Sequence, residues 1–116
     1  MDEFDEVLVR TIDKTFRCVL GNRNALVVYR YLEKVSCPIR ETPRKLDVFS
    51  KALRDLLGTG RGQILGVSSV LEDAIVVALS SELGVKPDGK LRVFEDRVRR
   101  MKEKYENGQY TKARGK

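Results

Sequence analysis

The chain has 116 residues, of which 41% are hydrophobic and 34% charged, and its formal net charge is +6. This length is typical of one domain and is sufficient to bury a core without disulfides or metals. The chain contains no histidine, which excludes imidazole general-base catalysis, Ser-His and Cys-His dyads and histidine-containing zinc sites.

Helical periodicity predicts four helices in the first 89 residues. The apolar residues recur at spacings of three and four over residues 3–20, 22–35, 46–57 and 64–83. Glycines end the first, third and fourth of these stretches, and Cys37-Pro38 ends the second. Residues 36–44, with two prolines, are expected to form a loop. No stretch shows sustained strand alternation, so the predicted fold is all-α.

Residues 64–83 are the most apolar stretch and are expected to form the central helix of the core. Serines and the acids Glu72 and Asp73 interrupt this stretch, and a membrane span needs about 20 nearly uninterrupted apolar residues. The acidic N-terminus lacks the basic region of a signal peptide. We therefore expect a cytoplasmic protein that does not contact membranes.

The composition changes at residue 90. Five apolar residues follow at spacings of three and four, a narrow stripe typical of an amphipathic helix: Leu91, Phe94, Val98, Met101 and Tyr105. We predict a compact four-helix body over residues 1–89, a basic amphipathic helix over residues 90–105 and a disordered basic tail over residues 106–116. The stripe can pack on the body of its own chain or form an interface with a second copy or another protein, and both interpretations stay open here.

The entire net positive charge lies in the last 27 residues. Residues 1–89 contain 13 basic and 13 acidic side chains, whereas residues 90–116 contain 10 basic and four acidic ones. Such asymmetry is typical of an attachment to nucleic acid or to another acidic partner. The predicted nucleic-acid contacts are one flank of the fifth helix and the tail, namely Arg97, Arg100, Lys104, Lys112, Arg114 and Lys116.

Part of this charge is expected to be neutralised within the helix. Glu95 and Arg99, and likewise Asp96 and Arg100, have the i, i+4 spacing of favourable helical ion pairs. The leading hypothesis is therefore electrostatic attachment to DNA or RNA without base-specific recognition. The alternative is a protein-docking or homodimerisation module that uses the apolar stripe.

Two further features have the residue types of binding sites. Gly60, Arg61 and Gly62 precede a predicted helix and form a weak candidate anion site, but no strand precedes them and no Gly-Lys-Ser/Thr follows, so this is not a P-loop. Glu72 and Asp73 point about 100° apart on their helix, and one is expected to pair with Arg30, Arg54 or Arg61.

The two cysteines, Cys18 and Cys37, are too few for a thiolate zinc site. We expect both to be buried or half-buried thiols, although the sequence leaves a disulfide open. With no catalytic or metal-binding constellation, the chain is predicted to be a non-enzymatic module that uses no cofactor and no metal.

Short motifs over roughly residues 8–84 resemble those of a known family. They are Val19-Leu20-Gly21-Asn22, Val28–Lys34, Pro43, Phe49–Leu53, Leu57-Gly58-Thr59-Gly60, Leu71–Ile75 and Leu83-Gly84. These motifs resemble small archaeal helical output domains of the NitrOD type. The chain differs from that pattern in a longer stretch between Gly62 and Glu72 and in its basic C-terminal extension. The resemblance implies an all-α fold, an archaeal origin and a regulatory role, and it brings no catalytic residues.

Overall fold

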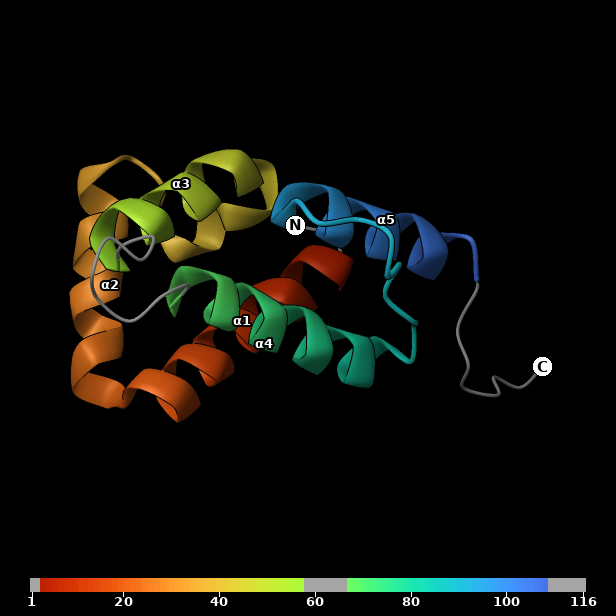
Figure 1. Ribbon diagram of the computed structural model, residues 1–116, viewed down its shortest axis with the longest axis horizontal. Helices are drawn as coiled ribbons and strands as arrows, with labels where there is room; N and C mark the ends of the chain where they lie inside the picture. The colour runs from red at the N-terminus through yellow and green to blue at the C-terminus, as the bar shows by residue number, and fades with distance from the viewer. Residues whose placement is uncertain (1–2, 58–66, 109–116) are drawn as a thin grey trace.

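The structure, a computed structural model, describes residues 3–57 and 67–108, with the side chain of Val67 excepted. Within these ranges the chain forms five α-helices and one 3-10 helix and no strand, which confirms the all-α prediction (Figure 1). The elements are α1 (Glu3–Leu20), α2 (Asn22–Lys34), η1 (Ile39–Arg44), α3 (Leu46–Leu57), α4 (Val67–Leu83) and α5 (Phe94–Glu106).

Helix α4 packs against α1, α3 and α5, whereas α3 packs against α2, η1, α4 and α5, so the contacts do not single out α4 as the central helix that the sequence predicted. Helix α2 packs on α1 and α3 and stands at one end of the molecule, whose longest dimension is 48 Å, while α5 runs toward the other end (Figure 1). The amino end of α1 lies beside α5, where the rings of Phe4 and Tyr105 are 6.2 Å apart. The two ends of the molecule therefore present surfaces from different elements.

Three phenylalanines connect the helices through the core. The ring of Phe49 lies 6.0 Å from that of Phe16 and 5.8 Å from that of Phe94. These residues belong to α1, α3 and α5, and all three are buried. Aromatic pairs at such distances add to the stabilisation by area burial alone, so α5 is part of the core.

Left-handed glycines end two helices as the sequence predicted. Gly21 has φ 86° between α1 and α2, and Gly84 has φ 69° after α4. Residues with a Cβ rarely adopt this conformation, and glycine does so without steric cost.

The prediction of a loop over residues 36–44 was wrong for residues 39–44, which form the 3-10 helix η1. The amide of Glu41 donates to the carbonyl of Pro38 at 2.8 Å, and that of Lys45 donates to the carbonyl of Thr42 at 2.9 Å. A 3-10 helix this short loses only one donor to Pro43 and therefore tolerates that proline.

The fifth helix begins at Phe94, four residues later than predicted. The amides of Lys90 and Leu91, which precede the helix, take part in a turn that begins at Asp88. Lys90 N–H donates to the Asp88 carboxylate at 2.9 Å, and Leu91 N–H donates to the Asp88 carbonyl at 3.3 Å. An Asp side chain that bonds the backbone two residues ahead favours a turn over a helix.

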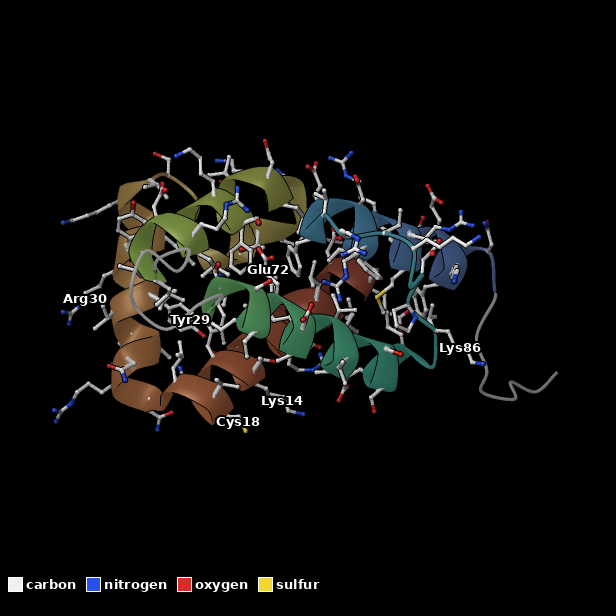
Figure 2. The ribbon with its side chains drawn as sticks, viewed as in Figure 1. Lys14, Cys18, Tyr29, Arg30, Glu72 and Lys86 are labelled. Atoms are coloured by element: carbon white, nitrogen blue, oxygen red, sulfur yellow. The ribbon has the colours of Figure 1, made fainter. Side chains whose placement is uncertain are left out.

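The cysteines are both free, but only Cys37 is buried. Burial raises the pKa of its thiol. Cys18 is exposed, so the expectation for this residue was wrong: it lies on the outer side of α1, away from the core (Figure 2).

Candidate nucleic-acid interface

The apolar stripe of the fifth helix packs on the chain's own body. Phe94, Val98 and Met101 are buried at 2%, 1% and 0% exposure, against α3 and α4, while Leu91 and Tyr105 are half-buried. An interface with a second chain would need these side chains at the surface. For Phe94, Val98 and Met101 the assignment to such an interface is therefore corrected, because they belong to the core. Leu91, which precedes α5, and Tyr105 keep part of their surface exposed.

Arg97 lies at the boundary between α5 and α4 and is not a free surface cation. Its Nη1 donates to Asp73 Oδ1 at 2.7 Å, and its side chain is only 18% exposed. The guanidinium is thus committed to a carboxylate of the same chain, which corrects its assignment as a phosphate contact.

Arg100 and Lys104 lie close to the turn that follows α4. Arg100 Nε is 3.7 Å from Asp88 Oδ2, and its Nη1 donates to Glu103 at 3.1 Å, so the predicted pair with Asp96 is replaced by these two. The ammonium of Lys104 donates to the main-chain oxygen of Lys86 at 3.1 Å. The predicted pair of Glu95 with Arg99 is confirmed at 2.5 Å.

These contacts identify a cation that sequence analysis missed, Lys86. Its side chain is exposed and makes no ion pair with any residue in the described ranges, and Figure 2 places it at the end of the molecule toward which α5 runs. The sequence offered only a turn signal at this position, because the proximity of Lys86 to α5 depends on how α5 folds back. Lys86, Arg100 and Lys104 are called the basic end below.

Several predicted residues lie outside the described ranges. They are the tail cations Lys112, Arg114 and Lys116 and the anion-site candidates Gly60, Arg61 and Gly62. The tail follows α5 in the chain, and α5 ends at Glu106 with Gly108 in the left-handed conformation.

The adjacent acids of α4 have structural partners, but neither makes the expected direct ion pair with Arg30 or Arg54, and Asp73 pairs with Arg97 instead. Glu72 accepts a hydrogen bond of 2.5 Å from the hydroxyl of Ser50, whose oxygen in turn accepts one of 2.9 Å from Arg54. Burial raises the pKa of Glu72 above its ordinary value, against the opposing effects of the Ser50 bond and the nearby arginines. The two acids do not share one site, since Asp73 turns to Arg97.

The described residues contain no group of three or more Cys, Asp and Glu side chains arranged to hold a metal ion. No helix within residues 3–57 or 67–108 combines the length and the apolar character needed to cross a membrane. Comparison with protein-family models, with curated proteins and with solved structures finds no match to this chain. The resemblance to NitrOD-type output domains therefore depends on the quoted motifs alone.

Proposed function

We propose that this protein is a non-enzymatic module that attaches to DNA or RNA through its basic end and the tail cations Lys112, Arg114 and Lys116. The observation that supports this proposal is the location of the whole net charge in residues 90–116. This stretch includes Arg100, Lys104 and the three tail cations. Lysine and arginine side chains that neutralise phosphates release counterions, and this release supplies sequence-independent affinity.

The basic end takes its cations from two segments whose backbones are adjacent in the fold. Lys86 follows α4, whereas Lys104 belongs to α5, and the Lys104 ammonium reaches the Lys86 backbone. Clustered like charges raise the local concentration of a polyanion more than separated ones do. Asp88 and Glu103 both lie beside Arg100, so we assign the stronger contribution to the two lysines.

The proposed contacts are to phosphates and not to bases. A recognition helix must enter the major groove with several side chains free to reach base edges. Helix α5 instead has its apolar stripe in the core, and Arg97 is committed to Asp73. The remaining exposed cations suit positioning on a backbone, which carries no sequence information directly.

The test is a binding titration of the full chain with a short DNA duplex and an RNA hairpin at about 50 mM and about 200 mM salt. We compare wild type with the substitutions Lys86→Gln/Lys104→Gln and with neutralisation of the three tail cations. Each lost phosphate contact reduces the slope of log affinity against log salt by about 0.9 on duplex DNA, so the tail variant should lose about two to three units of slope.

The matched control is Arg10→Gln/Arg40→Gln, which also removes two exposed charges that form no ion pair with described residues. This control should bind like wild type. Absence of salt-sensitive binding by wild type, or equal loss in the control, overturns the proposal. Truncation at residue 89 is not a clean test, because it removes Phe94, Val98 and Met101 from the core.

A further inference from the structure

The outer face of α2 combines cations with exposed apolar side chains. It consists of Arg23, Leu26, Val27, Arg30 and Lys34, and is called the α2 face below. At 3.6 residues per turn the three cations lie within about 40° of one another. They are opposite the stripe of Ala25, Val28 and Leu32, which is buried against the body. The α2 face therefore points directly away from the core.

The cations of this face are not used within the described part of the chain. Arg23, Arg30 and Lys34 are exposed and form no hydrogen bond or ion pair with any described residue. Figure 2 shows Arg30 pointing outward at the end of the molecule that α2 forms. Arg17 on α1 and Lys51 on α3 each pair with an acid four residues away, whereas Arg10 and Arg40 are exposed and, like the cations of the α2 face, form no ion pair with described residues. What distinguishes the α2 face is that three such cations lie together on one side of one helix.

Two large aliphatic side chains lie among these cations. Leu26 and Val27 are each 48% exposed. A solvated helix face normally carries polar residues at such positions. Valines elsewhere, such as Val70 and Val77, are more exposed, so what distinguishes this face is the combination of Leu26 and Val27 with three adjacent cations.

A groove continues from this face to α3. It is a hollow of about 260 Å³ lined by Val27, Arg30, Tyr31, Lys34 and Leu56. Val27, Tyr31 and Leu56 supply an apolar lining, and Arg30 and Lys34 supply the charge. A ligand that fits this groove needs an apolar anchor together with anionic groups.

The larger hollow between α1 and η1 differs from this groove in its charge. Its volume is about 420 Å³, and the acids Glu6 and Asp13 line it together with Arg10 and Arg40. With two acids and two arginines, the formal charges of these lining residues sum to zero. Among the described residues that line the groove between α2 and α3, the charged ones are Arg30 and Lys34, both cations, so this lining favours an anionic partner.

We propose that the α2 face and its groove dock an acidic amphipathic helix of another protein. The cations complement carboxylates, and Leu26, Val27 and the groove receive apolar anchors at helical spacing, as in helix-in-groove recognition. From Arg23 to Lys34 the face extends over about 16 Å, which is the length of three turns of a partner helix. This surface lies at the opposite end of the molecule from the basic end (Figure 1), so the proposal is independent of the proposed function.

Other occupants fit the observations less well. A second copy that presents the same face would bring like charges together, since the face has three cations and its helix has a single acid, Glu33. Nucleic acid would use the cations but would leave Leu26 and Val27 without an apolar partner, because phosphate contacts do not cover aliphatic side chains.

The test uses the full chain and a synthetic peptide of about 16 residues with leucines at helical spacing on one face and glutamates on the other. A scrambled peptide of identical composition and a short DNA duplex serve as comparison probes. Affinity is measured by fluorescence anisotropy, and the site is mapped by NMR chemical-shift changes. The variants are Arg30→Gln/Lys34→Gln and Val27→Ser, with Arg10→Gln/Arg40→Gln as the matched control for loss of two charges.

We expect saturable binding that shifts resonances of α2 and Leu56. The double substitution on α2 should weaken binding about three- to tenfold, Val27→Ser should weaken it as well, and the control should not. Equal binding of the scrambled peptide, or preference of the α2 face for the duplex, overturns the proposal. Absence of shifts on α2 at about millimolar peptide also overturns it.

Discussion

Arg97 Nη1 donates to Asp73 Oδ1 at 2.7 Å, and this ion pair joins α5 to α4. The arginine is largely covered, whereas the Asp73 side chain is 63% exposed. The pair therefore joins a mostly buried guanidinium of the basic helix to a carboxylate that remains in contact with water. Among the cations of α5, Arg97 therefore has a structural role, whereas Arg100 and Lys104 are those proposed to contact phosphates.

Replacement of Arg97 by Gln should lower stability without lowering nucleic-acid affinity. Because Asp73 remains exposed, solvent screens the pair, and we expect a loss of at most about 1 kcal/mol in the free energy of unfolding. Urea denaturation measures this loss. Arg99→Gln, which removes a pair within α5 whose arginine is far more exposed than Arg97, is the matched comparison and should cost less. A fall in affinity for duplex DNA in the Arg97 variant alone would contradict the assignment.

Replacement of Met101 by Ala should destabilise the whole domain. Met101 has 0% exposure, and truncation of a buried Met to Ala costs about 2–5 kcal/mol through lost burial and the cavity left behind. A single cooperative urea transition with a lower midpoint is the expected result. Val77→Ala, at a position 66% exposed on α4, should stay within about 0.5 kcal/mol of wild type. Loss of the α5 signal alone, with the body intact, would show that α5 folds separately.

Replacement of Tyr29 by Phe should break a contact between α1 and α2. The Tyr29 hydroxyl donates to the Asp13 carboxylate, which also accepts a hydrogen bond of 3.0 Å from Arg17. The ring would keep its packing against Phe16, at 6.0 Å between centroids. A hydrogen bond to a charged group contributes about 1.5–3 kcal/mol, and partial exposure places the expected loss at the lower end. Tyr31→Phe is the control, and a loss as large there would refute this account.

The pH dependence of stability should change when Glu72 is replaced by Gln. Burial raises the pKa of Glu72 in the folded state above its ordinary value of 4.5. A raised pKa means that ionisation opposes folding, so this group lowers stability as pH rises from the unfolded pKa to the folded pKa. The stability of the Gln variant relative to wild type should therefore increase over that window and then level off. Urea titrations at a series of pH values measure the difference, and a flat difference across the window would contradict it.

Much of the fold could be predicted from the sequence, because helices are specified locally. The spacing of apolar residues and the positions of Gly21 and Gly84 gave the bounds of α1 and the end of α4, and both agree with the structure. The 3-10 helix and the late start of α5 escaped prediction. Both depend on particular hydrogen bonds, such as those to Asp88, which leave no periodic pattern.

The charge of the last 27 residues is a property of the sequence alone, and no packing alters its sum. Only the tertiary structure decided how the described part of that charge is used. Folding α5 back onto α3 and α4 put its apolar stripe in the core, paired Arg97 with Asp73 and brought Lys104 beside Lys86. The partners of these cations are 18 and 24 residues away in the chain. Helical periodicity describes neighbours within one or two turns, so contacts at such separations are determined by how the helices pack.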